Sequence, residues 1–174
     1  MVAEFARIWK AAQILANSAT DGKTKRMNSA GLIVCEATGR WTTAFRHLLR
    51  TQSPARQFPL YEARSLTEAA RTLEDCPGSI VAIEVAPENA GGALRWIAQL
   101  DDRDRMARAF ALATPALQLH AWVWREAGAA YVVPSPRQVG RTLDFLQWHL
   151  SRVPGPTVSE TDRIWNALPW NSHS

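Results

Sequence analysis

Apolar runs and amphipathic stretches alternate five times along this chain of 174 residues. The apolar runs, which predict strands, lie at 30–36, 58–63, 79–85, 107–114 and 130–133. The stretches that follow them, which predict helices, lie at 39–52, 65–75, 88–102, 116–128 and 135–153. Near-continuous apolar strands separated by helices are typical of a parallel sheet that is covered on both faces. The run at 58–63 contains Pro59, which favours a sheet edge because proline cannot donate to the ladder.

Parallel strands joined by right-handed crossovers predict an α/β fold with a doubly wound five-stranded parallel sheet. We expect a three-layer sandwich with the flavodoxin-like strand order 2-1-3-4-5. In this order the carboxyl ends of the first, third and fourth strands meet at a topological switch point, where open α/β sheets bind ligands. Glu36, Glu84 and Thr114 stand at those three ends, and we expect them to lie near one another.

The pattern divides the chain into three parts. We expect residues 1–27 to form an N-terminal amphipathic helix and linker, 28–153 to form the α/β domain, and 154–174 to form a tail with a short tryptophan-containing helix. In the tail, Ile164, Trp165 and Leu168 share one helical face. A helix this short is marginal alone in water, so it must dock. Its own domain and a groove on a partner are both open as docking sites.

Composition and cysteine placement exclude several functional classes. The net charge is +4, but the basic residues are scattered without a run, which indicates a solvated surface rather than a nucleic-acid patch. No apolar run approaches the ~20 residues that span a bilayer. Cys35 and Cys76 lie in separate segments without metal-ligand spacing, so neither a disulfide framework nor a zinc site is indicated. We therefore expect a cytoplasmic protein with no nucleic-acid, membrane or metal partner.

Motifs of catalysis are not found in the sequence. There is no Gly-x-Ser-x-Gly elbow, no His-Glu-x-x-His pair and no Walker loop, so we expect no catalytic residue, no enzymatic activity and no cofactor. An alternative is a small flavin- or anion-binding protein, because "EATGRWT" (36–42) follows the first strand where flavodoxins hold phosphate. Its spacing from Thr38-Gly39 to Thr42 is one residue longer than in the flavodoxin loop.

Two segments resemble the receiver domain of bacterial response regulators. "REAGAAYVVPSP" (125–136) is similar to the Ala-Gly-Ala turn, aromatic strand and closing proline of that family. "SIVAIEVAPENAGG" (79–92) is similar to its phosphoacceptor strand and following loop. The resemblance covers about residues 28–152 and implies a flavodoxin-like signalling domain.

In that family, an acid pair after strand one and an aspartate after strand three hold Mg²⁺, and the aspartate accepts the phosphoryl group. A hydroxyl after strand four and a lysine after strand five contact the phosphate. The resemblance carries these roles onto a degenerate set: Cys35, Glu36, Glu84, Thr114 (or Ala113) and Ser135. A thiol replaces a hard oxygen ligand, and a serine replaces the cation. The resemblance therefore implies a pseudo-receiver, with a phosphorylatable stand-alone response regulator as the alternative.

Glu84 has two interpretations. At the acceptor position its carboxylate extends one methylene farther than aspartate and supplies a permanent negative charge, loosely like a phosphorylated aspartate. The domain would then be held in one state without phosphorylation. In the simpler interpretation, Glu84 is an acid tolerated near a helix N-terminus, where the helix dipole favours negative charge.

The resemblance also implies a protein-interaction face, made of helix four, strand five and helix five. Trp122 and Trp124 are two residues apart on a predicted helix, so they cannot both point into the core, and at least one is expected to be exposed. Tryptophan is enriched in binding hot spots. The partner is expected to be a protein, or a second copy of this chain through the same face. The residues expected on this surface are Trp122, Trp124, Tyr131 and Trp148, together with Trp165 and Trp170 of the tail.

Overall fold

The computed structural model describes residues 29–52 and 58–154 of the chain. The predicted N-terminal helix and the tail with Trp165 and Trp170 lie outside the described residues. The strands are β1 (Leu32–Cys35), β2 (Leu60–Ala63), β3 (Ile80–Val85), β4 (Arg108–Ala113) and β5 (Ala129–Val133). The α-helices are α2 (Arg40–Gln52), α3 (Leu66–Asp75), α4 (Ala90–Ala98), α5 (Leu100–Arg103), α6 (Ala121–Glu126) and α7 (Leu143–Arg152). Two 3₁₀ segments, η1 (Pro115–His120) and η2 (Pro136–Thr142), precede α6 and α7.

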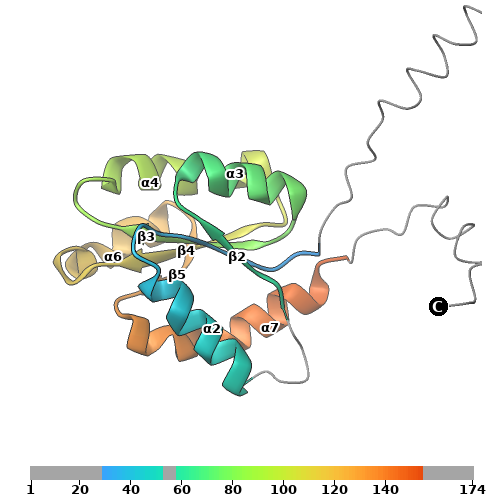
Figure 1. Cartoon of the computed structure of the whole chain (residues 1–174). Helices are drawn as coiled ribbons and strands as arrows, with labels where there is room; N and C mark the ends of the chain where they lie inside the picture. The colour runs from blue at the N-terminus through green and yellow to red at the C-terminus, as the bar shows by residue number, and fades with distance from the viewer. Residues whose placement is uncertain (1–28, 53–57, 155–174) are drawn as a thin grey trace, which may run out of the picture.

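The strands form one parallel sheet in the order β2-β1-β3-β4-β5, which confirms the predicted flavodoxin-like topology. Strand β2 is at the edge, as Pro59 indicates, and the carbonyl of Pro59 accepts a hydrogen bond from the amide of Leu32 (2.9 Å). Helices α3 and α4 cover one face of the sheet, and α2 and α7 cover the other (Figure 1). The result is the expected three-layer sandwich.

Strand alternation divides the core into two halves, because successive side chains of a strand point to opposite faces. In β3, Val81, Ile83 and Val85 pack with Trp96 and Trp124 on the side of α3, α4 and α6.

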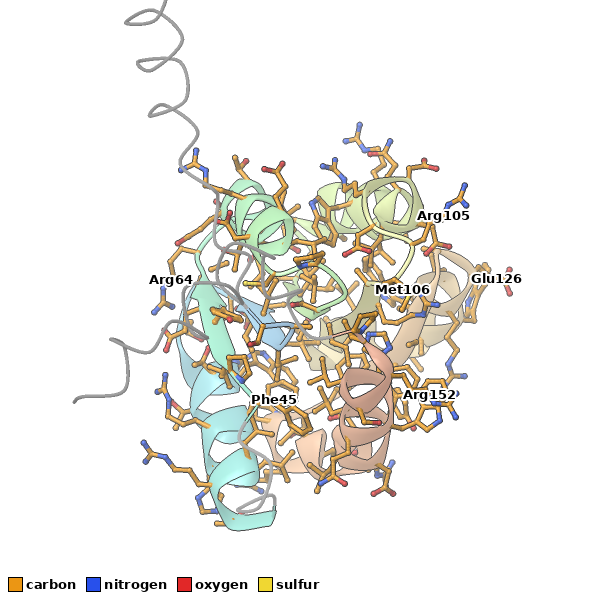
Figure 2. All side chains as sticks on the ribbon, turned by 90° about the vertical axis from the view of Figure 1, so that its right-hand side faces the viewer. Phe45, Arg64, Arg105, Met106, Glu126 and Arg152 are labelled. Atoms are coloured by element: carbon orange, nitrogen blue, oxygen red, sulfur yellow. The ribbon has the colours of Figure 1, made fainter. Side chains whose placement is uncertain are left out.

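On the other side, Ile80 and Ala82 pack with residues of α2 and α7, including Trp41, Phe45 and Leu146. Phe45 is directed inward in Figure 2, whereas Arg64, Arg105 and Arg152 project outward. The same alternation decides where the residues at the strand ends point.

Local hydrogen bonds explain where two of the predicted helices begin. Ser65 accepts from the amide of Glu68 (3.1 Å), which confirms the expected N-cap of α3. The Glu68 carboxylate reaches back to the amide of Arg64 (2.7 Å), one residue before the usual capping-box donor. Ser135 accepts from the amide of Arg137 (3.3 Å) and starts η2, with Pro136 in the first position.

Three segments that were each predicted as one continuous α-helix are divided into two shorter helices in the structure. The segment 88–102 breaks at Gln99 into α4 and α5, and the first half of 116–128 is the 3₁₀ segment η1. The segment 135–153 likewise begins as η2 before it becomes α7. Side-chain periodicity cannot separate the two helix types over so few turns, because 3.0 and 3.6 residues per turn give similar stripes. In the described part of the chain, no helix is long and apolar enough to cross a membrane.

Candidate functional site

Strand register brings the three predicted end residues to one edge of the sheet. Cys35 pairs with Ile83, and Val85 pairs with Ala113. Glu36 and Thr114 thus follow β1 and β4, and Glu84 is the penultimate residue of β3, all at the carboxyl ends of neighbouring strands. Alternation sends Cys35 to the α3 and α4 side of the sheet, with Ile33, and leaves Glu36 on the α2 side. The consecutive pair Cys35 and Glu36 therefore does not present two ligands to a common point.

Glu36 caps a helix. Its carboxylate accepts hydrogen bonds from the amides of Trp41 (2.9 Å) and Thr42 (2.5 Å) in the first turn of α2, and the residue is buried. Both carboxylate oxygens are thus engaged with amides that the helix itself leaves unpaired. The same bonds occupy the amides that a phosphate would need in a flavodoxin-like loop, which argues against the flavin or anion alternative.

Cys35 lies in the core beneath α3 and α4. Burial, reinforced by the charges of Glu68, Glu84 and Glu36, raises the pKa of its thiol to about 11. The thiol is therefore neutral at physiological pH, whereas a metal ligand or a nucleophile requires the thiolate. This residue supplies packing at the position where the resemblance implies a ligand.

Among the bonds that the described residues show, the Glu84 carboxylate receives donors only from the β1–α2 connection and the first two residues of α2. Its carboxylate accepts from the amide of Ala37 (3.3 Å), the guanidinium of Arg40 (3.1 Å) and the indole N–H of Trp41 (3.3 Å). The Glu84 side chain is 13% exposed, and the Arg40 side chain is 51% exposed. Gly39 has φ +83°, a left-handed conformation that favours glycine, at the turn from which Arg40 begins α2.

The loop after Glu84 is closed by Asn89. Its side-chain oxygen accepts from the amide of Ala86 (2.9 Å), and its side-chain nitrogen donates to the carbonyl of Glu84 (2.9 Å). These two bonds hold the Pro87 turn between β3 and α4. Glu84 is therefore fixed from its backbone as well as from its carboxylate.

Thr114 follows β4 and Ser135 follows β5, and their hydroxyl groups differ in hydrogen bonding. The amide of Thr114 donates to the carbonyl of Val85 (3.1 Å), and its buried hydroxyl has no hydrogen-bond partner within the described ranges. The Ser135 hydroxyl caps η2. The cation beside Glu84 is Arg40, the first residue of α2, and not a residue of the segment after β5.

Sequence reasoning missed Arg40 and Trp41 as partners of Glu84. A usable signal was present, because "GRW" (39–41) directly follows the end of β1, which neighbours β3 in the predicted strand order. The described residues contain no group of three or more histidine, cysteine or acidic side chains placed to hold a metal ion.

The predicted interaction face is corrected at one position. Trp122 is 65% exposed and Trp148 is 49% exposed, whereas Trp124 is buried at 3% and belongs to the core under α6. The expectation that at least one of Trp122 and Trp124 is exposed is confirmed; the placement of Trp124 on the surface is wrong, because the short α6 turns that residue inward. Tyr131 is half-buried and packs edge-on against Phe110, with ring centroids 5.5 Å apart.

An apolar groove of about 220 Å³ lies between the first turns of α4 and the segment η1–α6. We call it the α4–α6 groove. It is lined by Gly91 and Leu94 of α4 and by Leu117, His120, Val123 and Trp124.

This architecture is shared with a solved structure. The beryllofluoride-activated receiver domain dimer of NtrC4 matches with a TM-score of 0.54 and 16% identity, over 69% of this chain and 95% of that chain. The chain therefore shares the fold of that domain, a five-stranded flavodoxin-like α/β sandwich. A pilus assembly-related protein from Burkholderia pseudomallei K96243 matches with a TM-score of 0.49 and 17% identity, over 72% of this chain and 92% of that chain. No protein-family model matches the sequence, and no curated protein matches it.

Proposed function

We propose that this chain is a non-enzymatic protein-interaction module, a pseudo-receiver whose acidic edge is held in a single state by its own side chains. The observation that carries this proposal is the set of three donors on the Glu84 carboxylate, from Ala37, Arg40 and Trp41. A receiver that accepts a phosphoryl group needs free carboxylate oxygens for Mg²⁺. Here the oxygens of Glu84 and Glu36 are already hydrogen-bonded.

The charges at this edge support the same proposal. Arg40 places a guanidinium 3.1 Å from Glu84, where a bound divalent cation would meet repulsion. Cys35 is neutral and faces away, so it provides no compensating ligand. A permanent carboxylate–guanidinium pair replaces the reversible Mg²⁺ and phosphoryl chemistry of a working receiver.

The module would act through its surface. Trp122 and Trp148 are large exposed apolar side chains on α6 and α7, and the guanidinium of Arg152 lies 4.3 Å above the Trp148 ring. An exposed tryptophan beside arginine is typical of protein-binding hot spots. Trp122→Ala is expected to abolish partner capture or self-association while leaving the unfolding midpoint unchanged. Trp124→Ala is the contrasting variant, because it removes a core side chain and should lower stability.

The test of the single-state proposal is a titration of tryptophan fluorescence with Mg²⁺ and then with Mg²⁺ and beryllofluoride. The indole of Trp41 is bonded to Glu84, so its emission should report any new ligand at this edge. Subtracting the response of Trp41→Phe isolates this ring from the other tryptophans. We expect no saturable change. A saturable response that Glu84→Ala abolishes would show a working phosphoacceptor pocket and overturn the proposal.

A further inference from the structure

The outward face of α7 carries opposite charges on either side of a tryptophan. The exposed residues of this helix are Asp144, Trp148, Ser151 and Arg152. Asp144 precedes Trp148 by four residues and Arg152 follows it by four, so these three side chains lie in one row along the helix. We call Asp144, Trp148 and Arg152 the α7 row. Helix α7 belongs to an outer layer of the sandwich (Figure 1), and the row faces away from the sheet.

Both charged groups of the α7 row are available to a partner. Within the described residues, the Asp144 carboxylate and the Arg152 guanidinium form no hydrogen bond or ion pair. The guanidinium carbon of Arg152 lies 4.3 Å from the centroid of the Trp148 ring. This stacking uses the flat face of the guanidinium, so the N–H groups at its rim can still bind a carboxylate.

A row of this kind is complementary to itself. When two copies of a helix pack antiparallel about a two-fold axis at Trp148, a residue four positions before the axis meets the residue four positions after it in the second copy. Asp144 of each copy therefore meets Arg152 of the other. Each charge lies about 6 Å along the helix from Trp148. Rows of residues four apart align in the commonest class of helix packing, with the axes inclined by about 50°.

The neighbouring positions are compatible with the same axis. Phe145 and Ser151 lie three residues before and after Trp148, so a half-buried aromatic ring would meet a small side chain across the axis. The rings of Phe145 and Trp148 are already in contact, with centroids 5.7 Å apart. No like charges would face each other at three or four residues from the axis.

We propose that the α7 row binds α7 of a second copy of this chain, in an antiparallel two-fold dimer centred on Trp148. The inference rests on the proposed function, because it names the partner of a surface that the interaction module would use. Helix α7 has ten residues, so two such helices cover less than the roughly 1,200 Å² of a standard interface. The dimer is therefore weak, and its two ion pairs set the register.

Charge exchange in the full chain tests both the partner and the register. Asp144→Arg and Arg152→Asp each place like charges at both ends of the paired rows, so each should raise the dimer dissociation constant at least about tenfold. The double variant Asp144→Arg/Arg152→Asp restores opposite charges and should dimerise like the natural chain. An equimolar mixture of the two single variants should form a heterodimer, although neither pairs with itself. Sedimentation equilibrium at about 100 μM suits an interface of this size.

The matched controls are Arg71→Asp on α3 and Asp102→Arg on α5, which make the same charge changes at exposed residues of other helices. Both controls should dimerise like the natural chain. Single variants that pair in the mixture are folded, so their failure to pair alone reports the contact itself.

Three results would overturn the inference. A natural chain that is monomeric at about 100 μM would leave the α7 row to a different partner. A dimer that neither single variant weakens would use another surface. A dimer that the single variants lose, and that neither the double variant nor the mixture regains, would have another register. The proposed function fails by a different result, a saturable response of Trp41 to Mg²⁺ and beryllofluoride, so the two can fail separately.

Discussion

Replacing Glu84 with alanine tests which of its partners contributes most of the energy at the sheet edge. The indole N–H of Trp41 belongs to a ring that is 1% exposed, and in the described structure its acceptor is Glu84. Leaving such a donor unpaired costs about 1–3 kcal/mol. The Arg40 side chain is 51% exposed, so its ion pair is screened by water and contributes about 0.2–1 kcal/mol. We therefore expect Glu84→Ala to lower the free energy of unfolding by about 1–4 kcal/mol, most of it through Trp41.

A double-mutant cycle separates the two partners. Urea unfolding of Glu84→Ala, Arg40→Ala, Trp41→Phe and the two double variants gives the coupling energies from the midpoints, provided that the urea dependence stays constant. The Glu84–Trp41 coupling should be about 1–2 kcal/mol and insensitive to salt. The Glu84–Arg40 coupling should be below about 1 kcal/mol and should fade near 1 M salt, where charges are screened within about 3 Å. If the Glu84–Arg40 coupling energy equalled the Glu84–Trp41 coupling energy at about 1 M salt, this reasoning would be refuted.

Three other measurements follow from the packing. Burial lowers the pKa of His149, with Arg108 acting in the same direction and the bond to the Gly78 carbonyl (2.9 Å) and Asp104 opposing it. The stability that neutral His149 contributes should be complete above pH 6.5 and should be lost as pH falls from 6.5 to the lowered pKa. In urea unfolding measured over this pH range, His149→Gln should remove that dependence of the free energy of unfolding on pH. Gly78→Ala should lower the free energy of unfolding by about 1–2 kcal/mol or more, because φ at this residue is +75° and the new Cβ would lie 2.5 Å from a Val153 methyl. Adding Val153→Ala should relieve the steric contact but leave the cost of the positive φ. Cys35 should not react with a thiol reagent until the protein unfolds, because the thiol is buried and its pKa is raised to about 11. If Cys35 of the native protein reacted as fast as Cys35 of the unfolded protein, this prediction would be wrong.

The fold could be read from the sequence because its determinants are local and repeated. The continuous apolar run around Val81, bounded by turn residues, could only be a buried strand, and five such units leave few topologies. The N-caps Ser65 and Ser135 were predictable for the same reason, since capping depends on residues three or fewer positions away. Helix type at 116–120 was not predictable, because 3.0 and 3.6 residues per turn give similar side-chain stripes over so few turns.

The sequence predicted where the candidate site lies in the sheet, but not which side chains contact one another there. Strand order placed Glu36, Glu84 and Thr114 at one edge, and the register agrees. The direction of each side chain needed a second step, which is strand alternation: Cys35 turns to one face and Glu36 to the other. The partners of Glu84 depend on the path of the β1–α2 connection, which Gly39 sets with φ +83°. A loop path of this kind is not encoded in periodicity.

The hydrogen bonds of Glu36 and Glu84 suggest how the proposed single state of the domain would be stabilised. A working receiver collects negative charge at this edge and needs Mg²⁺ to stabilise it. Under the proposed function, this chain disperses its negative charge instead: Glu36 bonds a helix N-terminus, and Glu84 pairs with Arg40. Each carboxylate is hydrogen-bonded by groups that fold with it. Because Arg40 is half-exposed while Trp41 is buried, the guanidinium mainly balances charge and the indole mainly fixes geometry. A single substitution at Arg40 should therefore leave the fold intact and still fail to create a Mg²⁺ site, since Trp41 and Ala37 would continue to occupy the carboxylate.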